Sequence, residues 1–131
     1  MKFKSEDKFQ VACVNYLRKR DLYYYHVPNG MFSNRITVSR FKRMGMKPGI
    51  PDIIILDAFC GYHGLVVELK CGRNKLTDSQ LRWLGIFRSC NWGSVWLNDF
   101  DDFKFLIEAY VGGFFRNPEG SENFYFTSPS I

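Results

Sequence analysis

The stretch PDIIILDAFCGYHGLVVELK, residues 51–70, decides how this chain folds. Residues 52–56 form a short apolar run directly after a proline, which predicts a strand that is buried on both faces. Residues 57–63 contain Gly61 and predict a hairpin connection. Residues 65–70 supply the second strand. We therefore expect an antiparallel pair of strands near the centre of a sheet.

The two strands place acidic and basic side chains together at one end of this pair. Glu68 and Lys70 are two residues apart in a strand and therefore project from the same face. Asp52 begins the other strand and can face Glu68 across the pair. Two carboxylates and the nearby Leu69 carbonyl form a hard oxygen site of the kind that suits Mg²⁺ or Mn²⁺.

This combination of residues favours phosphodiester hydrolysis. The reaction needs charge neutralisation at the phosphate and an activated water, and a divalent cation supplies both. Lys70 can orient that water, help to deprotonate it, or stabilise the developing charge, and the sequence leaves these three roles open. Taken singly, Asp52 fits a turn acid, and Glu68 with Lys70 fits a surface ion pair. Their conjunction favours a catalytic site.

The rest of the chain predicts an α/β fold, a mixed β-sheet flanked by helices. Hydrophobic periodicity and capping residues indicate helices over residues 5–20, 36–44, about 77–89 and 99–110, and strands over 22–27 and 94–97. In the third helix we expect Leu81, Leu84 and Trp83 to face the core. We also expect Trp83, Trp92 and Trp96 to be core residues rather than platforms for base stacking.

The composition favours one domain and a polyanionic partner. The chain has 131 residues and a formal net charge of +5. Its four cysteines form no C-x-x-C pair, so a structural zinc site is not expected. The charged N-terminal residues lack the apolar stretch of a signal peptide, and no apolar run is long enough to cross a membrane. We therefore expect a soluble, cytoplasmic protein, located in the host cytoplasm if it is viral.

Basic residues cluster shortly before the predicted hairpin. They can form a solvated helix face, but beside an acidic site they are better interpreted as contacts to phosphate groups. The cluster contains Arg35, Arg40, Lys42, Arg43 and Lys47. His26 and Asn29 flank Pro28 in a turn near the expected site. For His26 we favour a structural or DNA-contacting role over catalysis.

An ordered set of short motifs resembles the VRR-NUC (virus-type replication-repair nuclease) domain family of the PD-(D/E)xK nuclease superfamily. The resemblance extends over roughly residues 6 to 97 and rests on the whole set, since an isolated E-x-K motif is weak. The matching pieces are Glu6 and Gln10, residues 26–30, residues 42–45, Gly49-Ile50-Pro51-Asp52, Glu68-Leu69-Lys70, and Gln80 followed by Trp83.

The resemblance implies a restriction-endonuclease-like core over residues 1–111, followed by a C-terminal tail over 112–131. It implies that Asp52 and Glu68 bind the metal and that Lys70 is the catalytic lysine. Glu6 would add an acidic group, directly or through water, although an acid there also suits the helix dipole. Gln80 would support Lys70 or the scissile phosphate. Stand-alone members of the family resemble Holliday-junction resolvases and are expected to be homodimers.

The leading functional hypothesis is therefore a Mg²⁺- or Mn²⁺-dependent DNA endonuclease that acts on branched or nicked DNA. A close rival has the same chemistry but cuts plain duplex, in the service of a phage or mobile element. A different class is a non-catalytic nucleic-acid-binding module. A further alternative is a partner-dependent subunit of a phage or host replication or packaging complex, with residues 114–126 as the docking element.

Overall fold

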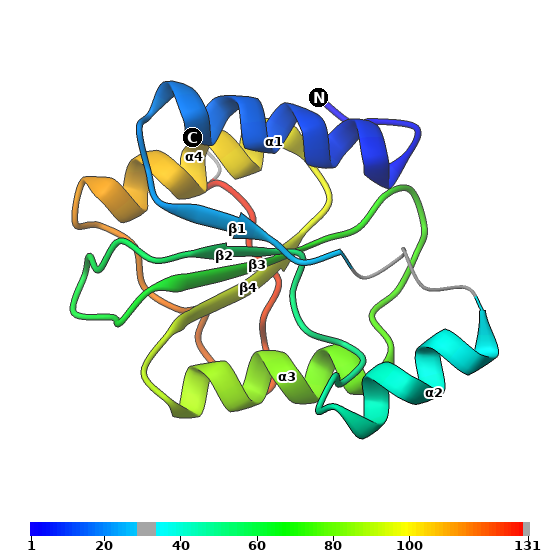
Figure 1. Cartoon of the computed structure of the whole chain (residues 1–131). Helices are drawn as coiled ribbons and strands as arrows, with labels where there is room; N and C mark the ends of the chain where they lie inside the picture. Colours follow the sequence, from blue (N-terminus) through cyan, green and yellow to red (C-terminus); the bar gives the residue numbers. More distant parts are fainter. Residues whose placement is uncertain (29–33, 130–131) are drawn as a thin grey trace.

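The structure is a computed structural model that describes residues 1–28 and 34–129. Its helices are α1 (Glu6–Lys19), α2 (Arg35–Arg43), α3 (Asp78–Ser89) and α4 (Phe100–Val111). Its strands are β1 (Tyr24–His26), β2 (Ile53–Ile55), β3 (Leu65–Leu69) and β4 (Gly93–Leu97). The strands form one sheet in the order β1-β2-β3-β4 (Figure 1). This confirms the predicted mixed α/β sheet.

The hairpin predicted from residues 51–70 is present. β2 pairs antiparallel with β3, with Ile53 opposite Val67 and Ile55 opposite Leu65. β1 adds to the other edge of β2 in antiparallel orientation, and β4 pairs parallel with β3. β2 and β3 are therefore the two inner strands, and each of them is hydrogen-bonded to a neighbouring strand along both of its edges.

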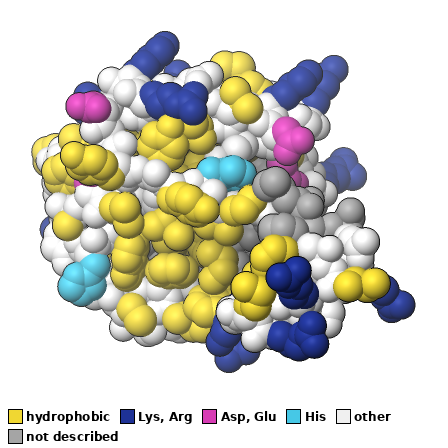
Figure 2. Space-filling model, viewed as in Figure 1, with side chains coloured by type: hydrophobic (Ala, Val, Ile, Leu, Met, Phe, Trp, Pro, Cys, Tyr) yellow, Lys and Arg dark blue, Asp and Glu magenta, His cyan; other side chains and the backbone are white. Residues whose placement is uncertain are grey.

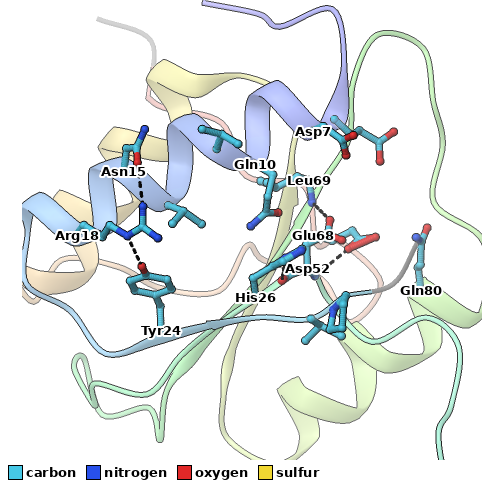
Figure 3. A pocket seen from close by; sticks show the side chains of 15 residues that line it. Asp7, Gln10, Asn15, Arg18, Tyr24, His26, Asp52, Glu68, Leu69 and Gln80 are labelled. Atoms are coloured by element: carbon cyan, nitrogen blue, oxygen red, sulfur yellow. Dashed lines mark hydrogen bonds between the residues drawn. The ribbon is translucent and has the colours of Figure 1, made fainter. Parts of the chain in front are cut away.

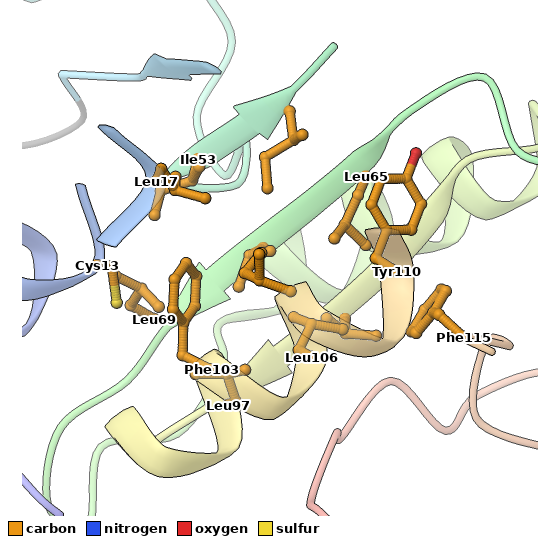
Figure 4. Close-up of a cluster of buried hydrophobic side chains, with 14 of the residues drawn as sticks. Cys13, Leu17, Ile53, Leu65, Leu69, Leu97, Phe103, Leu106, Tyr110 and Phe115 are labelled. Atoms are coloured by element: carbon orange, nitrogen blue, oxygen red, sulfur yellow. The ribbon is translucent and has the colours of Figure 1, made fainter. Parts of the chain in front are cut away.

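Helices cover the two faces of the sheet unequally. α1 and α4 lie together on one face, and α3 lies on the other (Figure 1). The larger core lies under α1 and α4 and includes Cys13, Leu17, Leu69, Phe103 and Tyr110, all buried (Figure 4). A smaller cluster of Val66, Leu84 and Phe124 lies under α3. Each fully buried large apolar side chain contributes roughly 1.5–3 kcal/mol.

Helix caps explain where α1, α3 and α4 begin. The Ser5 hydroxyl accepts a hydrogen bond from the Lys8 N–H at 3.2 Å, as predicted for an N-cap. Thr77 caps α3 in a reciprocal capping box with Gln80. Asp99 caps α4 by accepting from the Asp101 and Asp102 amides. These caps satisfy backbone N–H groups in the first turn of each helix.

The predicted buried faces of α3 and α4 agree with the structure to different degrees. The four α4 residues expected at helical spacing are all buried, namely Phe103, Leu106, Ile107 and Tyr110. In α3 only Leu84 is buried, and Leu81 is 39% exposed, so the expectation for Leu81 was wrong. α3 covers a narrow strip of the sheet, so a single row of its side chains reaches the core.

The half of the sheet that α3 leaves open carries apolar side chains. Tyr25 pairs with Ile54 across β1 and β2, on the same face as buried Val66. Tyr23, Tyr25 and Leu56 are 74%, 59% and 57% exposed. Figure 2 shows a broad hydrophobic patch over this region of the sheet and the adjoining part of α3. We call Tyr23, Tyr25, Ile54 and Leu56 the open sheet face.

The residues after α4 pack on their own chain. Phe115 and Phe124 are buried, and Tyr125 forms an isolated parallel bridge with Trp96 of β4. The Arg88 guanidinium lies 4.2 Å from the centroid of the Phe124 ring. It also donates to backbone carbonyls of this segment, those of Pro118, Gly120 and Asn123. The predicted division of the chain at residue 111 stays a prediction, but the segment itself folds against β4 and α3.

Among the residues that the structure describes, no helix combines the length and the apolar character needed to cross a bilayer.

Candidate active site

A cleft of about 800 Å³ opens at the end of the sheet where β2 begins and β3 ends (Figure 3). α1 forms one wall, β1 crosses the cleft, and the first turn of α3 closes one end. Several residues singled out by the sequence line it, namely Glu6, Gln10, His26, Asp52, Glu68 and Gln80. Residues far apart in the sequence are thus brought to one surface.

Asp52 and Glu68 lie side by side at the base of this cleft. The Asp52 N–H donates to Glu68 Oε2 at 3.1 Å, and the Leu69 N–H donates to Asp52 Oδ2 at 2.9 Å. These bonds extend the β2–β3 pairing to the residue before the start of β2, so strand register sets the separation of the two carboxyl groups. Glu68 is 2% exposed, whereas Asp52 is partly exposed to the cleft.

Burial, and after it the charge of Asp52, raise the pKa of Glu68 from 4.5 to about 9. The positive charge of Lys70 and the Asp52 amide act in the opposite direction. A carboxyl group in this environment keeps its proton at neutral pH unless a cation joins the pair. A strongly perturbed carboxyl group in a cleft is typical of a functional site.

Lys70 follows β3 directly and is 7% exposed. Its backbone N–H donates to the Leu97 carbonyl at 2.9 Å, which extends the β3–β4 pairing. Within the described residues its ammonium forms no salt bridge with a carboxylate. Lys70 is thus buried close enough to the acid pair for its charge to act on Glu68, although it is not among the described residues that line the cleft.

Gly49 lies in the loop before Asp52 and packs against the first turn of α3. Its φ of +91° lies in the left-handed region that favours glycine. A Cβ at this position would lie 2.6 Å from the Ser79 backbone carbon. Only glycine allows this approach, which packs the segment before Asp52 against the residue next to Gln80.

Gln80 and Glu6 face the cleft from opposite helices. Gln80 Oε1 accepts from the Thr77 N–H at 2.9 Å, so the carbonyl half of the amide serves the capping box. The amide nitrogen of Gln80 is then the half that is free to serve a ligand. Glu6 Oε2 accepts from Asn74 Nδ2 at 2.8 Å. Glu6 is thus held at the rim by Asn74, and its role as a metal ligand stays a prediction.

Gln10 and His26 complete the inner wall. The Gln10 Nε2 atom is buried and has no hydrogen-bond partner among the described residues, and Figure 3 shows the side chain directed toward Leu69 and His26. Gln10 belongs to the set of matching motifs, but no role was predicted for it from the sequence. Its position one helical turn after Glu6 was the signal available. His26 Nδ1 lies 3.2 Å from the Asp52 carbonyl, so its ring borders the acid pair.

The predicted phosphate-binding residues are solvent-exposed beside the cleft. Arg35, Arg40, Lys42 and Arg43 belong to α2, and Lys47 lies in the loop after it. Figure 2 shows Lys and Arg side chains gathered over α2. The prediction for Asn29 falls outside the described residues.

The donor set at the base of the cleft fits a hard divalent cation. Asp52 and Glu68 supply carboxylate oxygens, and Leu69 lines the same cleft. Adding positive charge here would offset the burial and repulsion that keep Glu68 protonated. Residues 1–28 and 34–129 contain no cluster of three or more His, Cys, Asp or Glu side chains that could hold a metal ion. The candidate ligands are therefore the acid pair, a backbone carbonyl and water.

The fold and this site together define a nuclease of the PD-(D/E)xK type. A family model described as VRR-NUC domain matches residues 4–98, so the chain belongs to the VRR-NUC domain family. A solved structure named VRR_NUC domain protein is similar, with a TM-score of 0.72 and 27% identity, covering 86% of this chain and 91% of that chain. A comparison with curated protein sequences gave no significant match. The predicted family and fold are thus confirmed.

Proposed function

We propose that this chain is a metal-dependent endonuclease that hydrolyses phosphodiester bonds in DNA. Membership of a nuclease family supports the general reaction. The observation that carries the specific proposal is the pairing of Asp52 with Glu68 at the base of an open cleft, where the nearby charge of Lys70 acts on Glu68. Acidic side chains facing the phosphate would only repel a ligand in a simple binding protein, whereas a hydrolase needs them.

Asp52 and Glu68 would hold Mg²⁺ or Mn²⁺, with the Leu69 carbonyl and Glu6, directly or through water, as further ligands. When bound, the cation supplies Lewis-acid stabilisation of the phosphate and a water of lowered pKa. Glu68 would give up its proton on becoming a ligand, because the charge of the cation would offset the burial and the Asp52 charge that raise its pKa. The strands fix the relative position of Asp52 and Glu68 in the metal-free protein.

Lys70 and Gln80 act on the phosphate and the attacking water. The Lys70 ammonium stabilises the negative charge that develops on the phosphate oxygens. The Gln80 amide nitrogen donates to a phosphate oxygen, because its carbonyl oxygen is held by Thr77. His26 borders the Asp52 backbone and contacts the DNA strand at the cleft wall. Lys70, Gln80 and His26 are thus each assigned one role toward the bound DNA.

The exposed basic residues of α2 position the DNA. Arg35, Arg40, Lys42 and Arg43 lie on a helix with no buried residue, and Lys47 extends the positive surface. Such residues contact the sugar-phosphate backbone and supply affinity without reading sequence. We therefore propose recognition of DNA shape, with preference for branched DNA of the kind that Holliday-junction resolvases cut.

We also propose that the enzyme is a homodimer joined through the open sheet face. Tyr23, Tyr25 and Leu56 are exposed on a sheet edge that α3 leaves uncovered. A contiguous exposed apolar surface of this kind is typical of an interaction site. A dimer would present two clefts, which suits a substrate with two equivalent strands. Sedimentation of Tyr25→Asp against the wild type tests the interface, and a monomeric variant is the expected result.

The function is tested by cleavage of a labelled panel in Mg²⁺, Mn²⁺ and EDTA. The panel holds a four-way junction, a flap, a plain duplex and a single strand. We expect metal-dependent cleavage by the wild type and a loss of about 10²- to 10³-fold in Lys70→Ala, in line with the removal of a transition-state donor. Lys104→Ala is the matched control, because this lysine lies on α4 and pairs with Asp101.

The outcomes separate the hypotheses. Cleavage by the wild type and by Lys104→Ala, but not by Lys70→Ala, supports the proposed site, and the preferred substrate defines the subclass. Equal cleavage by all three proteins would place the active site elsewhere. DNA binding without cleavage by any of them would favour the non-catalytic or partner-dependent alternative.

A further inference from the structure

A second groove, of about 690 Å³, lies next to the catalytic cleft. Its walls come from four segments, namely the end of β1, α2, the loop after α2, and α3. The wall residues used below are Pro28, Val38, Pro48 and Trp83, with Lys42 and Lys47 as the basic residues. The volume is in the range of pockets that hold small ligands.

The groove walls offer flat apolar surface and few hydrogen-bonding groups. Proline has no backbone N–H, so Pro28 and Pro48 contribute ring surface without a donor. Val38 adds an aliphatic surface from α2. The loop after α2 is held in place by a hydrogen bond from the Met46 N–H to the Phe41 carbonyl at 2.9 Å. The groove is therefore suited to an apolar group.

Trp83 is the largest side chain in this groove, and it does not have the core position expected from the sequence. Trp92 and Trp96 pack against the buried cluster of Val66, Leu84 and Phe124. Trp83 instead remains partly exposed and lines the groove. An indole in an open groove is a surface on which another planar ring can stack.

Positive charge lies over the same indole. Lys47 Nζ is 5.9 Å from the centroid of the Trp83 ring, and Lys42 lines the groove from α2. A cation–π contact at an exposed site is weak, so Lys47 is available to an arriving anion. An apolar slot with two lysines matches a ligand that has a planar ring and a phosphate.

The groove also adjoins the cleft that contains Asp52 and Glu68. Val27 and Pro28 line both cavities, so the wall of one is the wall of the other. A chain molecule bound across Asp52 and Glu68 can therefore place its next unit beside Trp83. The segment from Gly49 to Asp52 connects the two sites along the backbone.

We propose that this groove binds one unpaired nucleobase of the strand that lies in the catalytic cleft. The base stacks on Trp83 between Pro28 and Pro48, and Lys42 and Lys47 contact the phosphate attached to it. The inference rests on the proposed nuclease function and adds a substrate feature to it. The enzyme would select DNA that can release a base near the scissile bond, as at a flap, a bulge or a junction.

The test measures the affinity of a short fluorescent single strand by anisotropy in EDTA, which prevents metal-dependent cleavage. One abasic residue is placed at each position in turn. For the wild type we expect one abasic position to weaken binding by about 5- to 100-fold, as for the loss of a stacked base. In Trp83→Ala that penalty should vanish, and in Trp83→Phe it should return. Phe114→Ala, which removes an 83% exposed aromatic elsewhere, should keep it.

Thermal unfolding, followed by circular dichroism, shows whether each variant is folded. If Trp83→Ala is not folded, Trp83→Phe keeps the test valid. An equal abasic penalty in wild type and Trp83→Ala would overturn the proposal, and so would a wild type that shows no penalty at any position. If Trp83→Ala changes the sedimenting mass without any base dependence, a second protein copy occupies the groove and the proposal fails. Cleavage of the substrate panel is measured separately, so an absence of base binding in the groove would not contradict the proposed nuclease function.

Discussion

Asp52 and Glu68 lie at the ends of two paired inner strands, whereas Arg40, Lys42 and Arg43 lie on α2, a helix with no buried residue. The acid pair is held by backbone hydrogen bonds on both sides, so its geometry is part of the core. The basic helix is exposed and can adjust to the path of a phosphate backbone. The proposed metal-binding groups are therefore positioned by folding, whereas the proposed DNA-binding groups contribute charge and little stability.

The largest effect on stability should come from Glu68→Gln in the metal-free protein. The pKa of Glu68 is raised from 4.5 to about 9 in the folded chain, chiefly by burial and then by Asp52. Between these two values the unfolded chain has lost a proton that the folded chain keeps, so the free energy of unfolding falls as pH rises. Below pH 4.5 both states are protonated and the loss disappears.

Glutamine carries no titrating proton, so Glu68→Gln should be more stable than the wild type at pH 8, by on the order of a few kcal/mol. The two proteins should converge near pH 4. Urea unfolding in EDTA at a series of pH values measures this, with the exposed Glu122→Gln as control. An unchanged pH slope in Glu68→Gln would mean that Glu68 is not a buried acid.

An intermediate effect is expected from Gly49→Ala, which strains the loop that holds Asp52 against α3. Its Cβ would lie 2.6 Å from the Ser79 backbone, at a φ of +91°. We expect a loss of about 1–3 kcal/mol and slower cleavage, because Asp52 and Gln80 are displaced together. Gly113→Ala is matched in φ, at +85°, but meets nothing within 4 Å. Equal losses in urea unfolding would show that the Gly49 contact is unimportant.

The smallest effect should come from single alanine substitutions of Arg40 or Arg43. Both side chains are exposed, so the free energy of unfolding should change by less than about 0.5 kcal/mol. DNA affinity should fall a few-fold, and the slope of log affinity against log salt should decrease by about 0.9 for each lost phosphate contact. Titrations at several salt concentrations measure the slope. A large loss of stability would break the contrast between the acid pair and α2.

The acid pair could be predicted from the sequence because its geometry follows from local rules. A proline, two apolar runs and a turn fix an antiparallel hairpin, and side-chain alternation then places Asp52 opposite Glu68. The caps Ser5 and Thr77 and the buried face of α4 were predictable for the same reason. In each case the deciding contacts lie within a few residues or across one hairpin.

What failed depends on contacts between distant segments. Trp83 was expected in the core because it follows the apolar pattern of α3, but only neighbouring elements determine which side of the helix is covered. The packing of the C-terminal segment on its own chain was likewise not predictable from its Gly, Pro, Ser and Asn content. Phe115 and Phe124 nevertheless reach the core, and Arg88 binds the backbone between them. Such pairings have no periodicity that a single sequence reveals.

The central claim is that Asp52 and Glu68 form one metal site, and calorimetric titration of the metal-free protein with Mn²⁺ near pH 7 tests it most directly. Run in buffers of different ionisation enthalpy, the titration counts the protons released. We predict Mn²⁺ binding by the wild type with release of about one proton, because Glu68 is protonated beforehand. Asp52→Asn and Glu68→Gln should lose most of the affinity, and Lys104→Ala should retain it. Binding of equal strength in all four proteins, without proton release, would contradict the account.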